Sequence, residues 1–361
     1  MKIAICVGTR PEIIKMSPVI RALIKKNVDF IIIDSGQHYS ENMSRIFFEQ
    51  LNLPKPDYNL EVGSGRHGEI TAEIIKNVEK VLINEKPDVV LVQGDTNTVL
   101  GCAISASKLN IKIGHVEAGL RSRDMTMPEE KNRIIVDHIS DFLFAPTEEA
   151  KNNLIKENIC EEKIFVVGNT IVDATTENAE LVDNSILDKY GLEKKNYPLA
   201  TVHRQENVDN MEKLGNIVDS LVNLSEKHKI IFPVHPRTKK RLEEFGLLDK
   251  LKNNRNIVLT EPFGYKEFLS LEKNACLTIT DSGGVQEEAC ILGVPCVTIR
   301  ENTERPETIE VGANVLAGTD VKTTIEYAES MIGKKPGWEN PFGDGKSGER
   351  IVEIILKNKN L

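Results

Sequence analysis

Short apolar runs alternate with amphipathic stretches along the whole chain. In the first half the apolar runs are 3–7, 30–34, 89–93, 113–117, 142–145 and 164–168, and in the second they are 199–203, 230–235, 256–260, 276–280 and 296–300. Continuous apolar runs of this length are typical of parallel strands that helices cover on both faces. Segments 12–26 and 69–85 carry the periodicity of such helices. The pattern predicts an α/β protein with two parallel sheets.

The length of the chain favours two domains. Its 361 residues exceed the size of about 250–300 residues at which a single hydrophobic core stops growing. Segment 174–197 is polar and helical in character, so the boundary is expected shortly before it. We predict an N-terminal Rossmann-like domain over 1–170 and a C-terminal one over 171–346, facing a central cleft. The last helix, within 347–361, is expected to return to the first domain.

Composition narrows the classes of protein. The formal net charge of −9 argues against a nucleic-acid partner or an anionic membrane surface. The chain shows no apolar run near the ~20 residues of a membrane span and no signal peptide, so a cytoplasmic location is expected. Six cysteines without a CxxC pair indicate reduced thiols. The spacing of His and Cys predicts no metal site.

Two strand-end segments are candidates for phosphate binding, because ligands of parallel sheets bind beyond the carboxyl ends of the strands. In GTRPE (8–12), Arg10 precedes a helix whose N-terminus attracts anions, although a simple turn and cap would have the same sequence. In ITDSGG (279–284), small residues permit close approach and amides at the helix start donate to oxygens. Glu288, about two turns later, is a candidate acceptor for ribose hydroxyls.

Two other glycine-rich segments resemble cofactor motifs without their context. GSGRHG (63–68) matches the dinucleotide pattern, but the run before it is a poor buried strand. GDGKS (343–347) resembles a phosphate-binding loop, but Asn340 stands where that motif needs Gly and no strand precedes it. We therefore expect neither a nicotinamide cofactor nor NTP hydrolysis.

Acid–base candidates also lie at strand ends. Asp95 and Glu117 each end a strand of the first sheet. Glu129 begins a helix, where a carboxylate also suits the helix dipole. His203 and His235 end strands of the second half, where an imidazole can donate to a phosphate or move a proton. Carboxylates converging on one cleft predict acid–base chemistry.

Taken together, these segments resemble the non-hydrolysing UDP-N-acetylglucosamine 2-epimerases. The matching segments span nearly the whole chain in family order. They are GTRPE (8–12), GQH (36–38), QGDT (93–96), HVEAGLR (115–121), PEEKNR (128–133), TVHRQEN (201–207), PVHP (233–236), DSGGVQEEA (281–289), TERPE (303–307) and NPFGDGK (340–346). The resemblance implies a fold like that of many glycosyltransferases (GT-B-like), with the UDP-sugar between two Rossmann-like domains.

The resemblance also implies roles for individual residues. The family's catalytic positions fall on Asp95, Glu117, Glu129 and His203. Its substrate-binding positions fall on Arg10, Lys15, Arg133, His235, Phe263, Phe268, Ser282, Gly283, Gly284, Glu288 and Arg305, the two phenylalanines bordering the uracil. Gln37 and Arg66 are candidates for an activator site that bacterial members carry, but the run 37–43 (QHYSENM) departs from their pattern. A homodimer is implied by the family alone.

The activity so implied is inversion at C2 of the sugar, through anti elimination of UDP to 2-acetamidoglucal and re-addition of UDP. It requires no cofactor and no metal, and its product, UDP-N-acetylmannosamine, would feed surface-polysaccharide or glycan synthesis. Three alternatives stay open at this stage: a glycosyltransferase, a hydrolysing relative that releases N-acetylmannosamine, and a non-catalytic UDP-sugar sensor. Fold alone does not separate these.

Overall fold

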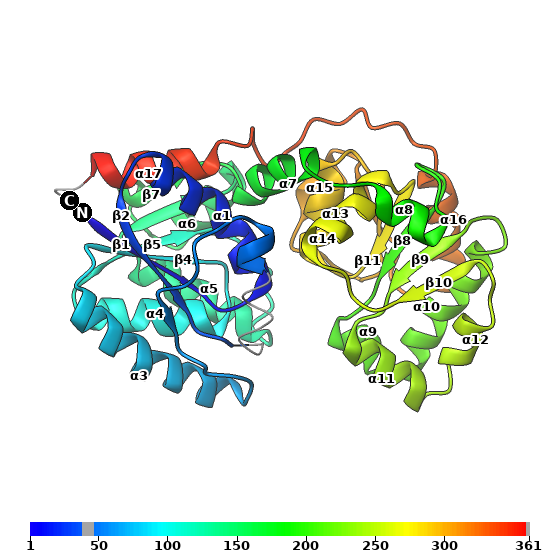
Figure 1. The fold of residues 1–361 in the computed structure, drawn as a ribbon, viewed down its shortest axis with the longest axis horizontal. Helices are drawn as coiled ribbons and strands as arrows, with labels where there is room; N and C mark the ends of the chain where they lie inside the picture. Colours follow the sequence, from blue (N-terminus) through cyan, green and yellow to red (C-terminus); the bar gives the residue numbers. More distant parts are fainter. Residues whose placement is uncertain (38–46, 359–361) are drawn as a thin grey trace. The chain divides into compact units, whose positions relative to one another are not determined.

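The computed structural model describes residues 1–37 and 47–358 and divides into two compact α/β units (Figure 1). Unit 1 comprises Met1–Ala174 together with the chain from Phe342 on, and unit 2 comprises Thr175–Pro341. Helix α7 (Thr170–Glu180) runs across the division. The division thus lies four residues beyond the expected boundary, and the return to unit 1 begins five residues earlier than expected.

Unit 1 is built on a seven-stranded parallel sheet. Its spatial order is β3 (Tyr58–Asn59), β2 (Asp29–Asp34), β1 (Lys2–Val7), β4 (Val89–Gln93), β5 (Lys112–Val116), β6 (Phe142–Ala145) and β7 (Ile164–Val166). Because all strands are parallel, their carboxyl ends lie at one edge. The chain order reverses between β1 and β4, and in open parallel sheets such a reversal is the usual place for a ligand.

Helices cover both faces of this sheet. On one face α3 (His67–Glu85), α4 (Asn97–Lys108) and α5 (Pro128–Ile139) pack against the strands. The buried side chains of this face include Ala4, Cys6, Ile74, Val78, Val90, Val92, Val99, Cys102 and Val136. Helix α6 (Glu148–Lys156) packs on β6 and β7 through Ala150 and Leu154. The alternating strand positions therefore bury apolar side chains in each layer.

The C-terminal helix α17 (Ser347–Lys357) lies beside α1 (Arg10–Lys25), where Figure 1 draws the red helix next to the blue one. Two ion pairs join them, Lys25–Glu349 at 2.6 Å and Lys26–Glu353 at 3.0 Å. The amide of Gly348 also donates to Asp173 at 2.9 Å. Gly348 allows this close approach, because a Cβ there would lie 2.7 Å from the backbone carbon of Pro18.

Gly348→Ala is therefore expected to destabilise unit 1. The added methyl group would meet backbone rather than a movable side chain, and overpacking of this kind costs about 1–3 kcal/mol. Urea or thermal unfolding measures the loss. Gly68→Ala in α3 is the matched control, since a Cβ there meets no described atom within 4 Å. Equal stability of the two variants would contradict the close packing of α17 on α1.

Unit 2 repeats this architecture with a six-stranded parallel sheet. Its order is β10 (Ile257–Thr260), β9 (Ile230–Pro233), β8 (Pro198–Thr201), β11 (Leu277–Thr280), β12 (Cys296–Thr298) and β13 (Asn314–Leu316). Here the chain order reverses between β8 and β11. The two loops that follow these strands carry His203 and the Ser-Gly-Gly segment.

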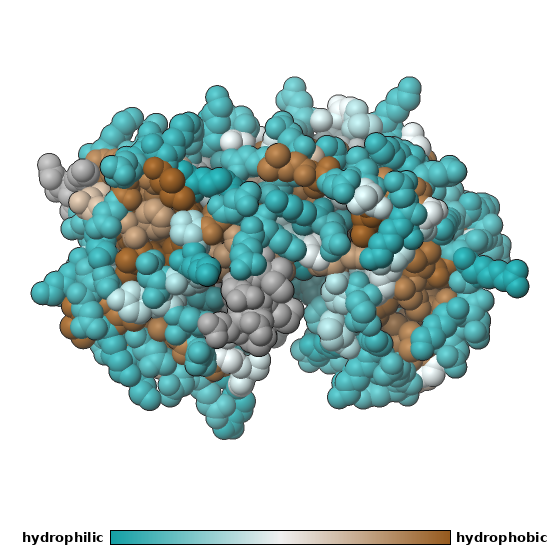
Figure 2. Space-filling view, viewed as in Figure 1, coloured by the Kyte–Doolittle hydropathy of each residue, from teal (hydrophilic) through white to brown (hydrophobic). Residues whose placement is uncertain are grey.

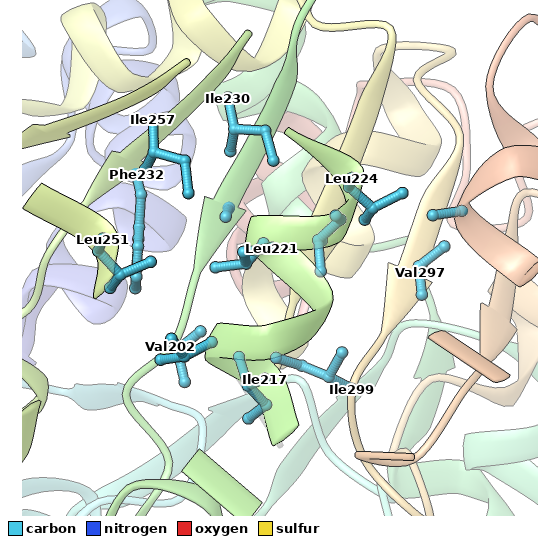
Figure 3. Close-up of a cluster of buried hydrophobic side chains, with 14 of the residues drawn as sticks. Val202, Ile217, Leu221, Leu224, Ile230, Phe232, Leu251, Ile257, Val297 and Ile299 are labelled. Carbon is cyan, nitrogen blue, oxygen red and sulfur yellow. The ribbon is translucent and has the colours of Figure 1, made fainter. Parts of the chain in front are cut away.

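Two apolar layers enclose this second sheet. Figure 3 shows Ile217, Leu221 and Leu224 of α10 (Met211–Leu224) packed with strand residues Ile230 and Phe232. On that face α11 (Pro236–Glu244), α12 (Leu248–Lys252) and α16 (Val321–Met331) complete the cluster. The opposite layer is formed by α8 (Ser185–Tyr190), α13 (Tyr265–Asn274) and α14 (Gly283–Ile291). Short helices α9 (Gln205–Val208) and α15 (Pro306–Glu310) lie in strand-end segments.

The α/β fold with two parallel sheets is confirmed, with two edge strands that the sequence did not predict. These are β3, which has two residues, and β13, which has three. The face in Figure 2 is mostly hydrophilic, with apolar side chains in small patches. Within residues 1–37 and 47–358, every helix is too short or too polar to cross a lipid bilayer.

Candidate active site

Asp95 and Arg133 form an ion pair at the carboxyl edge of the sheet in unit 1. Asp95 follows β4, and its Oδ2 accepts a hydrogen bond from Arg133 Nε at 2.9 Å and lies 2.7 Å from Nη2. Glu130 accepts a further bond from Arg133 Nη1 at 2.5 Å. Burial opposes the charge on Arg133, but the two carboxylates outweigh it and raise its pKa. Arg133, predicted as a substrate ligand, thus fixes the position of a predicted catalytic residue.

Glu117, which follows β5, pairs with Lys15 of helix α1. Lys15 Nζ donates to Glu117 Oε1 at 2.7 Å and Oε2 at 3.0 Å, and Gln93 Nε2 also donates to Oε2. Both charged side chains are buried, so each compensates the charge of the other. Glu117 has φ +72°, a left-handed conformation that is strained for a non-glycine residue. The amide of Glu117 donates to Phe144 O at 3.1 Å, which helps to hold this conformation.

A buried network below these residues supports the turn at Gly94. His115 bridges the Gly94 carbonyl, 2.8 Å from Nε2, and the Asp137 carboxylate, 2.6 Å from Nδ1. Arg121 Nη1 lies 2.7 Å from Asp137 Oδ2. Burial would raise the pKa of Asp137, but His115 and Arg121 outweigh it and hold the pKa below its ordinary value. The sequence analysis did not predict this role for His115 and Asp137. The only sequence signal was their position, one in a buried strand and the other in a helix.

The start of α1 places two further charged residues. Arg10 lies over the ring of Phe47, with its guanidinium carbon 4.9 Å from the ring centroid. The amides of Gly8 and Thr9 donate to the buried Glu12 at 2.6 and 3.1 Å. This loop was expected to offer its backbone to a phosphate, but these two amides already bind an internal carboxylate. The sequence analysis included Glu12 in the segment GTRPE (8–12) but assigned it no role.

Glu129 differs from the other predicted carboxylates. It lies in the first turn of α5, is half-buried, and makes no hydrogen bond or ion pair with another described residue. The next residue, Glu130, is buried and accepts bonds from the amides of Ser122 at 3.0 Å and Arg123 at 2.8 Å. Glu130 therefore anchors the loop before α5, and the catalytic role of Glu129 stays a prediction.

The two activator candidates lie in different segments, Gln37 after β2 and Arg66 at the start of α3. Gln37 is buried, and its Oε1 accepts bonds from the amide and hydroxyl of Thr98 at 3.0 and 2.7 Å. Arg66 is exposed and pairs with Glu69. Residues 38–43 of the divergent run lie outside the described residues. The activator site stays a prediction.

In unit 2, Asp281 connects the loops after β8 and β11. Its carboxylate accepts bonds from the amides of His203 at 3.0 Å and Arg204 at 2.9 Å, and His203 Nδ1 lies 3.1 Å from Oδ1. The rings of His203 and His235 lie 5.8 Å apart between centroids. Burial, with the charge of His203 and Arg237 adding to it, lowers the pKa of His235. His235 Nδ1 accepts the Arg237 amide at 3.2 Å, so the proton of the neutral ring is on Nε2.

The Ser-Gly-Gly segment forms an open helix start, which we call the glycine cradle (Ser282, Gly283 and Gly284). Within the described part of the chain, the amides of Gly283 and Gly284 have no acceptor. A Cβ on Gly284 would meet no described atom within 4 Å, and one on Gly283 would approach only Glu304 Oε2 at 3.7 Å. Packing does not require these glycines, whereas a ligand close to the backbone would.

Glu288 lies behind the glycine cradle, next to a second buried carboxyl group. Glu288 in α14 is 7% exposed, and Glu272 in α13 is fully buried. Neither carboxyl oxygen of Glu272 has a hydrogen-bond partner among the described residues. Burial and, secondarily, the charge of Glu288 raise the pKa of Glu272 well above its ordinary value. Sequence reasoning predicted Glu288 and missed Glu272.

Arginines surround Glu304 beside the cradle. Arg300 Nη1 lies 2.8 Å from Glu304 Oε2, and Arg204 Nη2 lies 3.9 Å from Oε1. Burial acts against the charge, but these arginines, with Arg305, lower the pKa of Glu304 to about 2. Arg305 itself pairs with Glu287 at 2.6 Å. The predicted ligand Arg305 thus belongs to a cationic cluster next to Gly283.

The predicted uracil neighbours have a packing role in the structure. Phe263 and Phe268 are half-buried against the apolar layer of α8, α13 and α14. The Phe263 ring meets Tyr190 edge to face, with centroids 5.7 Å apart. Their contact with a base stays a prediction.

In the described ranges, no three His, Cys, Asp or Glu side chains are grouped so that they could hold a metal ion.

Comparison with known proteins gives a consistent result over the full length. Residues 21–356 match the family described as UDP-N-acetylglucosamine 2-epimerase. The Methanocaldococcus jannaschii UDP-N-acetylglucosamine 2-epimerase is 60% identical, covering 99% of this chain and 100% of its own. The Pseudomonas aeruginosa UDP-2,3-diacetamido-2,3-dideoxy-D-glucuronate 2-epimerase is 42% identical, covering 99% and 100%.

Solved structures agree with these matches. The crystal structure of the M. jannaschii UDP-GlcNAc 2-epimerase in complex with UDP-GlcNAc and UDP has a TM-score of 0.92 and covers 99% of this chain and 100% of that chain. The Neisseria meningitidis UDP-GlcNAc 2-epimerase bound to UDP-GlcNAc has a TM-score of 0.91 at 35% identity, covering 99% and 100%.

Proposed function

The chain belongs to the UDP-N-acetylglucosamine 2-epimerase family, and we propose that it interconverts UDP-N-acetylglucosamine and UDP-N-acetylmannosamine. The observation that carries this proposal is the pair of strand-end carboxylates in unit 1. Asp95 is held by Arg133 and Glu117 by Lys15, so each is oriented by a cation that is itself largely buried. Such fixed carboxylates suit proton transfer to and from a sugar carbon.

We propose an elimination and re-addition sequence. The C2 hydrogen of the sugar is not next to a carbonyl, so its direct removal as a proton is prohibitive. If the C1–O bond breaks first, UDP leaves with the electron pair and the positive charge at C1 acidifies C2–H. A carboxylate then removes that proton and leaves 2-acetamidoglucal. A proton returned to the opposite face of C2 and re-addition of UDP give the epimer.

The two units would divide this work. The amides of Gly283 and Gly284 lack protein acceptors among the described residues and suit the oxygens of the departing diphosphate. Asp95 binds Arg133 through Oδ2, and its Oδ1 makes no hydrogen bond with the other described residues. We therefore assign proton transfer to Oδ1. His203, 38% exposed at its side chain, is the matching candidate in unit 2.

The identity of the sugar needs its own test, because the P. aeruginosa relative is named for a different substrate, a UDP-linked diacetamido glucuronate. Membership of the epimerase family favours isomerisation over the glycosyltransferase and sensor alternatives. Dimerisation, a cytoplasmic location and use of the product in glycan synthesis stay predictions.

Incubation with UDP-N-acetylglucosamine and no acceptor tests the proposal. We expect the anomeric NMR signal of UDP-N-acetylmannosamine to appear, with no free N-acetylmannosamine. UDP-2,3-diacetamido-glucuronate is the comparison substrate, and a higher kcat/KM with it would replace the proposed sugar. Release of free sugar would instead identify a hydrolysing enzyme.

In deuterated water the epimer is expected to carry deuterium at C2, because the removed proton exchanges with solvent before its return. Long incubation should also release traces of 2-acetamidoglucal and UDP. Mass spectrometry and proton NMR of the product measure both. Complete retention of hydrogen at C2 would contradict elimination while leaving epimerisation itself intact.

A further inference from the structure

Glu12 joins two loops at the point where the strand order of unit 1 reverses. It lies in the first turn of α1, after β1, and is 2% exposed. One carboxyl oxygen accepts the amides of Gly8 at 2.6 Å and Thr9 at 3.1 Å. The other accepts the hydroxyl of Thr96, which follows β4. Because β1 and β4 are neighbours in the sheet, one carboxylate connects both strand-end loops.

The Thr96 hydroxyl carries this connection to the candidate catalytic residue. Thr96 is directly bonded in sequence to Asp95, and its Oγ1 also caps α4 by accepting the amide of Thr98 at 3.2 Å. A hydroxyl that donates to Glu12 and accepts from α4 holds the peptide of Asp95 from one side. Arg133 holds the Asp95 carboxylate from the other.

The groups facing Glu12 come from three elements. The β1–α1 loop contributes the Gly8 and Thr9 amides, the β4–α4 loop contributes the Thr96 hydroxyl and the Asp95 carboxylate, and α4 contributes the Cys102 thiol. Burial, with the Asp95 charge as a smaller contribution, raises the pKa of Glu12 to about 7, although the three donors oppose this.

A comparable carboxylate in unit 2 supports a positioning role. Asp281 bonds the amides of His203 and Arg204 across the reversal between β8 and β11. Its pKa lies below the ordinary value, since His203 and the backbone amides outweigh its burial. Both units thus use a buried carboxylate to tie their reversal loops together, but the neighbouring charge is a histidine in one and Asp95 in the other.

We propose that Glu12 in its ionised form is a positioning residue that acts through Thr96 to set the position of Asp95. This inference rests on the proposed epimerase function. Ionised Glu12 accepts all three bonds and so holds the two strand-end loops together. Protonated Glu12 loses acceptor capacity and weakens this connection.

The test compares pH profiles of kcat/KM for wild type and Glu12→Gln. Wild type is expected to gain activity through a midpoint near pH 7, where Glu12 ionises. Glu12→Gln has nearly the same shape without the charge, so its profile is expected to be flat there and roughly 10- to 100-fold lower, with UDP affinity unchanged. Asp141→Asn is the matched control, because Asp141 accepts the Ile113 amide at the opposite edge of the sheet.

Thr96 variants separate positioning from folding. Thr96→Ser keeps the hydroxyl and is expected to keep the wild-type midpoint. Thr96→Val removes the donor that favours ionised Glu12, so its midpoint is expected to move to higher pH. A purely structural role would lower activity without moving the midpoint, and that result would overturn the inference.

Thermal unfolding gives a readout that is independent of catalysis. Folded Glu12 binds its proton more tightly than the unfolded chain does, so its ionisation destabilises the fold as pH rises from about 4.5 to about 7. The melting temperature of Glu12→Gln relative to wild type is therefore expected to rise across this window. A difference in melting temperature that stays constant across this pH window would overturn the assigned titration of Glu12. Inactive wild type would overturn the proposed function, whereas active wild type with an unchanged Glu12→Gln profile would overturn only the role of Glu12.

Discussion

Asp95→Asn is expected to lower kcat by at least ~100-fold, the usual loss when a general acid or base is removed. The asparagine oxygen can still accept from Arg133, whose Nε donates to Asp95 Oδ2 at 2.9 Å. The position of the side chain is thus retained while its basicity is lost. Steady-state kinetics with UDP-N-acetylglucosamine measure the effect, and calorimetry is expected to show nearly unchanged UDP affinity.

Asp57→Asn is the matched control for this change. Asp57 accepts the Ile32 amide at 2.8 Å beside β2, so the substitution alters a carboxylate with a structural contact and no predicted catalytic role. Its kcat should stay close to that of wild type. A kcat near wild type for Asp95→Asn would remove Asp95 from the acid–base groups, and a matching loss in Asp57→Asn would point to general destabilisation.

The strands could be predicted where they are buried on both faces. The run 89–93 coincides with β4, whose five residues are all buried. The two missed strands have two and three residues at the edges of their sheets, where fewer neighbours demand apolar side chains. Several predicted runs also extended too far: 199–203 and 230–235 include His203 and His235, which lie in loops after the strands end.

Candidate site positions could be proposed from the sequence, whereas their contacts could not. Residues just beyond a strand are identified by their place in the chain, which is how Asp95, Glu117 and His203 became candidates. Their partners come from distant segments: Lys15 lies 102 positions from Glu117 in the sequence. The burial that gives Glu12 and Glu272 their unusual proton affinity depends on packing between helices and strands, and no local pattern encodes it.

Gly284→Val is expected to lower UDP affinity by at least ~100-fold without destabilising the protein. A Cβ at this position meets no described atom within 4 Å, so the fold has room for the side chain. The proposed diphosphate would occupy that room, and two charge-assisted hydrogen bonds from the cradle amides are worth about 1.5–3 kcal/mol each. Losing them corresponds to a reduction of at least ~100-fold in affinity. Calorimetric titration with UDP measures it.

Gly215→Val provides the matched control for the cradle. Gly215 lies in α10 of the same unit, and a Cβ there also meets no described atom within 4 Å. Both variants place a β-branched residue in a helix, so any propensity cost is shared. Only Gly284→Val should lose UDP, while thermal unfolding of the two should agree. Tight UDP binding by Gly284→Val would place the diphosphate elsewhere, because a bound phosphate and a valine side chain cannot fill the same space above the start of α14.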